Sequence, residues 1–242
     1  MYNTPTKVTR RLSRTGQLII TSIVVVIIGF WAVPKVDPIA RLKKLFLSES
    51  NFYLDLGNQS LDAADFQKAV VNYTRSIKAN EKNAKAWHGR ARAYCQMGRF
   101  NRCLSDINQA ITLSPDDPVL YFERSNIFHN DAKWDETFTD LGKALDLKPD
   151  YFDALVARAV SFSQTGKLED SIRDFTAALD AVPHGIEKKD LATVYAERGL
   201  VYYWNQQPDK AIADFHKTLD IFPAAKRSFL PQLAILKQEL ES

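Results

Sequence analysis

Apolar residues recur along most of the chain at the spacing of a helix face, and turn residues interrupt this pattern at regular intervals. In one stretch Trp87, Ala91 and Tyr94 lie three to four residues apart, and the letters MGR then break the pattern. A second amphipathic run follows and ends at Pro115. The pattern predicts a pair of amphipathic helices joined by a tight turn.

This helix pair is one copy of a repeating unit. Five copies can be aligned, and they begin at Phe52, Ala86, Leu120, Ala154 and Val194. The first four begin 34 residues apart, and the fifth begins 40 residues after the fourth. The additional residues fall around PHGIEKKDLA, where we expect a longer loop or an N-terminal extension of the next helix. One unit cannot bury its own apolar face, so stacking of neighbouring units must supply the core.

The unit resembles the tetratricopeptide repeat, whose signature places aromatic, small, glycine and proline residues at fixed offsets. In the second copy these positions hold Trp87, Ala91, Tyr94, Gly98, Phe100, Ile107, Ala110 and Pro115. The copies depart from the signature at Glu81, Cys103 and Thr137. The resemblance implies an all-α fold, a right-handed α-solenoid of about five helix-turn-helix units.

The repeats divide the chain. We expect a repeat domain over residues 50–225, with units near 50–83, 84–117, 118–151, 152–185 and 192–225. Beyond it, Phe229, Leu233 and Leu236 fall on one apolar stripe, which predicts a capping helix over 226–242.

An arginine and an aspartate recur together in four of the five copies. The aspartate follows 16 residues after the arginine, in the pairs Arg90–Asp106, Arg124–Asp140, Arg158–Asp174 and Arg198–Asp214. The first copy has Leu56 and Asn72 at these two positions. Because a guanidinium can bind a carboxylate through two parallel hydrogen bonds, this joint presence and loss predicts a structural pair inside each repeat. The competing interpretation, four anion-binding sites, is disfavoured by the inward helical phase of these residues.

A separate apolar stretch precedes the repeats. Residues 15–34 include a run from Leu18 to Val33 without a charge, and 19 helical residues span about 28 Å, close to the thickness of the hydrocarbon core of a bilayer. A buried core helix is one alternative, and a cleaved signal peptide is another, because basic residues precede the run. The stretch GFWAVPKVDP offers no good pair of small residues for cleavage. We therefore expect a single membrane-spanning anchor.

Basic residues flank this anchor on both sides. Residues 1–14 form a basic tail, whose composition also suits a mitochondrial targeting segment, and residues 35–49 form a basic amphipathic segment. The second segment either lies on anionic lipid or packs as a cap on the first repeat. The charge difference between the flanks is small, but the charges before the anchor belong to a short, fully basic tail, which favours an N-terminus on the inside, with the repeats in the periplasm or the intermembrane space. The alternative is repeats that face the cytosol on the mitochondrial outer membrane.

Composition and motifs argue against chemistry carried by this chain. The formal net charge of +3 is too small to indicate a nucleic-acid partner. The four histidines share no metal-ligand spacing with each other or with Cys95 and Cys103, and no phosphate loop or nucleophile elbow is present. Two cysteines supply no disulfide framework, and we expect Cys103 to serve in packing. We expect no enzyme activity, no metal and no cofactor.

The resemblance implies instead a concave groove, lined by the first helix of each repeat, that binds a segment of a partner protein. Carried over by position, the groove residues are Asn58, Lys85, His88, Arg92, Phe122, Asn126, His129, Val156, Val160, Leu200, Tyr203 and Trp204. The second and third repeats then contribute a basic, polar stretch, and the fourth and fifth an apolar, aromatic one. No window of three repeats holds the lysine, asparagine and arginine clamp with which some family members bind the terminal carboxylate of chaperones.

Together these features predict a non-enzymatic, membrane-anchored adaptor. Its expected partner is a subunit or assembly client of a membrane complex. Two alternatives stay open: an import-type receptor that captures targeting peptides, and an accessory subunit of an enzyme complex.

Overall fold

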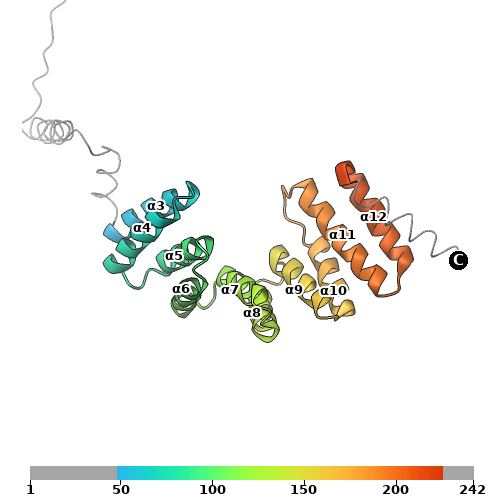
Figure 1. The fold of residues 1–242 in the computed structure, drawn as a ribbon, viewed down its shortest axis with the longest axis horizontal. Helices are drawn as coiled ribbons and strands as arrows, with labels where there is room; N and C mark the ends of the chain where they lie inside the picture. The colour runs from blue at the N-terminus through green and yellow to red at the C-terminus, as the bar shows by residue number, and fades with distance from the viewer. Residues whose placement is uncertain (1–47, 226–242) are drawn as a thin grey trace, which may run out of the picture.

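The computed structural model describes residues 48–225, which form ten α-helices, one short 3-10 turn and no strand (Figure 1). The expected anchor over 15–34 and the capping helix over 226–242 lie outside the described residues, as does nearly all of the segment 35–49. Among the helices described, none has the length and apolarity that crossing a membrane requires.

The helices are arranged as five consecutive antiparallel pairs. The pairs are α3 (Glu49–Asp62) with α4 (Phe66–Ala79), α5 (Ala84–Gln96) with α6 (Phe100–Leu113), α7 (Pro118–Asn130) with α8 (Trp134–Leu147), α9 (Phe152–Gln164) with α10 (Leu168–Asp180), and α11 (Lys188–Trp204) with α12 (Pro208–Ile221). Each pair packs on the next, so that the whole forms an arch (Figure 1). The first helix of every pair lies toward the inside of the arch and the second toward the outside.

The turn inside each pair has one residue in the left-handed region. These residues are Ala64, Gly98, Ala132, Gly166 and Gln206, with φ between 53° and 75°. Two of them are glycines, which adopt this conformation without the steric cost that a Cβ imposes. The other three residues adopt the left-handed conformation although they carry a Cβ, so the turn is a property of the repeat fold and does not depend on a glycine.

Large side chains from the second helices fill the space between first helices. Tyr73 on α4 is fully buried, and its ring lies against Gly57 on α3 and Gly89 on α5. A Cβ at either glycine would overlap this ring. Burial raises the pKa of Tyr73 to about 12. Phe215 on α12 fills the corresponding space beside Gly199. The small residues are therefore required by close helix packing.

The insertion before the fifth repeat gives both of the expected features. A loop over residues 181–187 contains Gly185 at φ +81°, and α11 begins early, so that it has 17 residues where α9 has 13.

Candidate protein-binding groove

The Arg–Asp pairs join the two helices of four repeats. In each, the arginine Nε and one terminal nitrogen donate to the two carboxylate oxygens over 2.6–2.9 Å. The aspartate side chains are only 4–8% exposed. The hydrogen bond to Asp140 raises the pKa of Arg124, against the opposing effect of burial. An arginine that binds a buried carboxylate in this way forms a structural ion pair and is not free to bind another anion.

In the first repeat, hydrogen bonds between neutral groups take the place of this ion pair. Asn72 donates to the carbonyl oxygen of Leu56 at 3.3 Å and to Ser60 Oγ at 3.2 Å. In the four charged repeats, the position equivalent to Ser60 holds an aromatic residue whose ring lies 5.5–5.9 Å from the guanidinium carbon. Three positions therefore change together: arginine, aromatic and aspartate become leucine, serine and asparagine.

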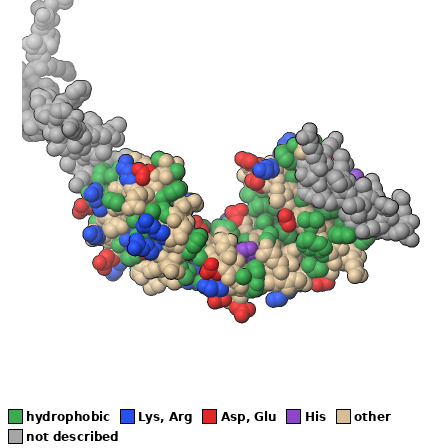
Figure 2. Space-filling view, in the orientation of Figure 1, with side chains coloured by type: hydrophobic (Ala, Val, Ile, Leu, Met, Phe, Trp, Pro, Cys, Tyr) green, Lys and Arg blue, Asp and Glu red, His purple; other side chains and the backbone are tan. Residues whose placement is uncertain are grey.

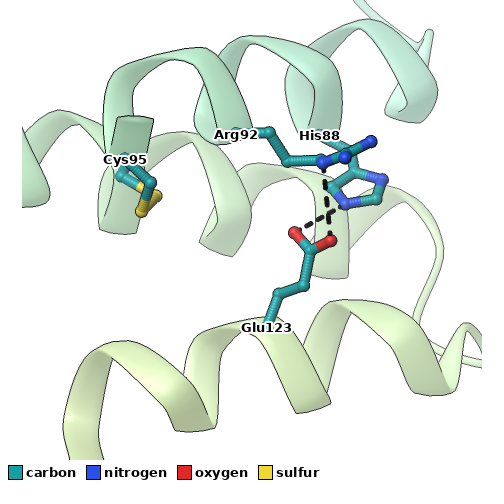
Figure 3. The surroundings of a disulfide bond; sticks show 5 residues. His88, Arg92, Cys95 and Glu123 are labelled. Atoms are coloured by element: carbon teal, nitrogen blue, oxygen red, sulfur yellow. Dashed lines mark hydrogen bonds and ion pairs between the residues drawn. A yellow bond between two sulfur atoms is a disulfide. The ribbon is translucent and has the colours of Figure 1, made fainter. Parts of the chain in front are cut away.

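On the inner face, polar residues of α5 meet α7. Glu123 Oε2 accepts a 2.8 Å hydrogen bond from His88 Nε2, and Glu123 Oε1 lies 3.7 Å from Arg92 Nε (Figure 3). His88 and Glu123 are each about a quarter exposed, and Arg92 is more than half exposed. This cluster bridges the second and third repeats along the groove. Sequence reasoning named His88 and Arg92 but missed Glu123, which lies one position after Phe122 on the same helix.

A cavity of about 410 Å³ opens beside this cluster. Residues of α5, α6 and α7 line it, namely Arg92, Cys95, Gln96, Phe100, Cys103, Phe122, Glu123, Asn126, Ile127 and Asn130. Phe100 is 50% exposed, so the cavity has an apolar side beside its polar one. Such a mixture of apolar surface and a few polar groups, at a size of several hundred Å³, is typical of ligand sites.

The cavity wall also corrects one expectation. Cys95 and Cys103 form a disulfide with a Cα–Cα distance of 5.3 Å. We expected no disulfide framework and a packing role for Cys103, which is buried at 2% exposure but is covalently bonded as well. The spacing of eight residues concealed the pairing, because it matches no familiar cysteine motif. The antiparallel return of α6 along α5 brings the two positions together.

The remaining predicted groove residues differ in their surroundings. Asn58 accepts a 2.8 Å hydrogen bond from the Tyr73 hydroxyl, and Lys85 is exposed. His129 contacts Ser161 Oγ at 2.9 Å and lies edge-on to Trp134. The ring of Phe122 packs against that of Tyr151, whose pKa burial raises to about 12.

Toward the C-terminal end the predicted residues are of two kinds. Val156 and Val160 are half-buried against the core between the fourth and fifth repeats, and Leu200 packs within the fifth. Tyr203 and Trp204 are 38% and 53% exposed. Aromatic exposure at this end of α11 is therefore confined to its last two residues.

Charge is uneven along the arch. Residues 84–117 carry five basic and three acidic side chains, whereas residues 118–187 carry seven basic and thirteen acidic ones. Figure 2 shows Lys and Arg gathered at the N-terminal end of the arch, and the surface hollowed between its two ends. Of the residues predicted to line the groove, the two basic ones, Lys85 and Arg92, both belong to the second repeat. Within residues 48–225, no group of three histidine, cysteine or acidic side chains is placed to hold a metal ion.

Sequence comparison identifies the repeat type. The family described as "Tetratricopeptide repeat" matches residues 84–117. Superkiller protein 3 of Schizosaccharomyces pombe is 37% identical over 71 residues, which are 29% of this chain and 5% of that protein. Hsp70-Hsp90 organizing protein 1 of Arabidopsis thaliana is 32% identical over 57 residues, which are 24% of this chain and 10% of that protein. The matches thus span a tenth or less of these relatives, and neither name describes an enzyme.

Solved structures extend the likeness to the fold. The crystal structure of MamA has a TM-score of 0.62 at 19% identity and covers 75% of this chain and 96% of that one. The crystal structure of YrrB, named as a tetratricopeptide repeat protein with an unusual peptide-binding site, has a TM-score of 0.60 at 15% identity and covers 76% and 91%. At these identities the likeness shows the fold alone. The described residues thus share the fold of these structures, and residues 84–117 within them match the tetratricopeptide repeat.

Proposed function

We propose that this chain, a solenoid of tetratricopeptide repeats over its described length, is a non-enzymatic, membrane-anchored adaptor. It holds a segment of a partner protein in its inner groove and supports the assembly or stability of a membrane protein complex. The observation that carries the proposal is the cavity between α5, α6 and α7, which combines an apolar side at Phe100 with exposed polar groups at Arg92 and Asn126.

The comparisons support a role in protein binding without naming the partner. YrrB, which shares the fold, is described as having a peptide-binding site, and a curated relative is named as an organizing protein for two chaperones. An extended or helical segment is the natural occupant of a curved helical surface of this kind.

The location of the repeats is also a proposal. The apolar residues 15–34 anchor the chain, and the repeats face the periplasm or the intermembrane space. The Cys95–Cys103 disulfide supports this orientation, because disulfides persist in oxidising compartments and are rare in the cytosol. Protease digestion of sealed inner-membrane vesicles tests it. External protease should digest the repeats in right-side-out vesicles, whose outer surface is the oxidising side, and should leave them intact in inverted vesicles. The opposite result would contradict this orientation.

A second candidate function is capture of targeting peptides by an import-type receptor. The acidic excess over residues 118–187 favours it, because targeting peptides are basic and amphipathic. The two functions differ in the lifetime of the complex. An adaptor retains its partner in stoichiometric amount through purification in detergent, whereas a receptor exchanges basic peptides with micromolar affinity.

The adaptor function is tested with matched variants of the full chain, purified in detergent from its native membrane. Asn126→Trp places a bulky side chain at the cavity, and Gln67→Trp places the same side chain on the exposed surface of α4. We expect Asn126→Trp to lose the stoichiometric partner at least tenfold while Gln67→Trp retains it. Equal retention by both variants, with circular dichroism unchanged, would show that the groove does not hold the partner.

A further inference from the structure

The disulfide joins the last turn of α5 to the first turn of α6, within the second repeat. Its two cysteine residues differ in exposure. Cys103 is 2% exposed, while Cys95 is partly exposed, and both residues line the cavity between the second and third repeats. The bond is therefore accessible from the groove, and chiefly at its Cys95 end.

The helix hairpin does not need this bond. The position of Cys103 is occupied in the other repeats by Ala69, Thr137, Ser171 and Ala211, all at most 1% exposed. Those four repeats form the same hairpin without a covalent link. A small buried residue is thus what packing requires here, and the thiol chemistry of the second repeat is additional to it.

We propose that Cys95–Cys103 is a thiol–disulfide exchange site that opens on the cavity. A thiol that enters the cavity loses its proton to solvent, and its thiolate attacks Cys95 Sγ. A new sulfur–sulfur bond forms at Cys95 while the bond to Cys103 breaks, and the electron pair leaves with the Cys103 sulfur, which then takes up a proton. The product carries a mixed disulfide on Cys95 and a free thiol at Cys103, with no net change in oxidation state.

The surroundings of the two cysteines determine which sulfur is attacked and which one leaves. An incoming thiolate is expected to attack the sulfur of Cys95, since Cys95 is partly exposed whereas Cys103 is only 2% exposed. Cys103 is the fourth residue of α6, whose first turn has no acidic residue and whose N-cap, Arg99, provides no side-chain cap. The positive end of this helix and the adjacent Arg102 favour negative charge on the departing sulfur, while its burial opposes that charge.

The cavity also accommodates the attached group. At about 410 Å³ it is within the size range of sites for small ligands. The nearby carboxylate of Glu123 would repel an anionic thiol, but His88 and Arg92 already contact it (Figure 3). A group attached at Cys95 would occupy the space between α5 and α7. Exchange would therefore fill the same cavity that the proposed partner segment uses, although the reaction itself does not depend on that function.

Two kinds of thiol fit this chemistry, a low-molecular-weight thiol and a cysteine of a bound protein. To test the site, the full chain in detergent is treated with reduced glutathione, quenched with excess N-ethylmaleimide in denaturant so that buried thiols also react, and digested for mass spectrometry. We expect glutathione on Cys95 and N-ethylmaleimide on Cys103. Glutathione found on Cys103, or a disulfide that reacts only after denaturation, would overturn the proposal.

Two matched variants make the test specific to the cavity. Asn126→Trp should slow glutathione addition at least tenfold, whereas Gln67→Trp should leave the rate unchanged. Equal rates in both would show that the thiol does not approach through the cavity. Cys103→Ala, which copies the first and fifth repeats, should fold and bear a free Cys95 that is alkylated without reductant.

A second arm distinguishes the source of the thiol. Native membranes are quenched in acid, and their free thiols are then alkylated with N-ethylmaleimide. The proteins are separated on non-reducing gels, and the masses of peptides that contain Cys95 are measured. A protein-sized adduct identifies a partner cysteine, and a tripeptide-sized adduct identifies glutathione; either supports the proposal. An intact Cys95–Cys103 bond in every preparation, together with no reaction of the native chain with added glutathione, contradicts it.

Discussion

Replacement of Arg124 by leucine tests whether the repeated charge pair holds each helix hairpin. The substitution copies Leu56, which occupies this position in the first repeat. It leaves Asp140, whose side chain is 4% exposed, without the two 2.7 Å hydrogen bonds that its carboxylate accepts from the guanidinium. The variant therefore buries an uncompensated charge.

The size of the effect follows from this burial. Removal of one partner of a buried ion pair costs roughly 3–5 kcal/mol, and the partial exposure of Arg124 places this pair near the lower end, at about 3 kcal/mol. Addition of Asp140→Asn removes the charge, and the new amide can donate to the carbonyl oxygen of residue 124, as Asn72 does to Leu56. We expect the double variant to be only about 1 kcal/mol less stable than the wild type.

A third substitution makes the third repeat match the first repeat at all three of these positions. Phe128→Ser supplies the hydroxyl acceptor that Ser60 provides to Asn72. The same step removes an aromatic side chain that is only partly buried, and this loss opposes the gain of the hydrogen bond, so we expect this addition to change stability little beyond the double variant. Its role is to test whether the three positions are coupled through hydrogen bonding alone.

Native-state hydrogen exchange on the full chain in detergent measures these differences, because solenoids open locally and a single unfolding midpoint would average over repeats. The opening free energy of amides in α7 and α8 should fall by about 3 kcal/mol in Arg124→Leu and recover by about 2 kcal/mol in the double variant. A single variant within 0.5 kcal/mol of the wild type (about the usual effect of a surface change), or a double variant no more stable than the single, would refute a buried structural pair.

Three further predictions concern backbone, packing and pH. Ala132→Gly should raise stability by about 0.5–1 kcal/mol because Ala132 holds φ +53°, and Gly98→Ala should lower it by about 1 kcal/mol; thermal melting that moves both variants the same way would contradict this. Gly89→Ala should cost about 2–3 kcal/mol in urea unfolding because its Cβ overlaps the Tyr73 ring, and an unchanged midpoint would show that the ring moves freely. The pKa of Tyr73 is raised to about 12, so below pH 10 its phenol is protonated in both folded and unfolded chains. Between pH 10 and 12 only the unfolded chain loses this proton, and stability should fall by up to about 1.4 kcal/mol per pH unit, a slope that Tyr73→Phe lacks.

The features that the sequence predicted well are those that recur. The 16-residue interval from Arg124 to Asp140 indicates proximity because the same interval appears in four repeats, and the structure places each pair within hydrogen-bonding distance. The helix pairs follow from the same periodicity. Repetition indicates which positions are in contact because every unit packs on its neighbour through equivalent residues.

Features that the sequence marks in only some of the repeats were harder to predict. The turn at Ala132 lacks the glycine that marks the equivalent turn at Gly98, so only alignment with the other repeats reveals its left-handed residue. The same alignment contained an unused signal for the disulfide. Cys95 and Cys103 are equivalent to Leu61 and Ala69, two apolar positions that face each other across the first hairpin and share one core cluster.

The contact between the second and third repeats was also missed for a physical reason. Glu123 lies at a partly exposed position of α7, where hydrophobic periodicity gives no information about partners. Its interaction with His88 depends on how α5 and α7 are placed relative to each other, and this placement is a property of the stacked fold rather than of either helix.

Site-specific photo-crosslinking in native membranes tests the central claim most directly, because it asks which face of the solenoid touches the partner. A benzophenone amino acid is introduced into the full chain at Asn126, which lines the groove cavity, or at Gln67, which is exposed on the second helix of the first repeat. The account predicts one dominant protein crosslinked from position 126 and little or none from position 67. Crosslinks to that protein from position 67 alone, or equally from both, would contradict a partner segment held in the groove.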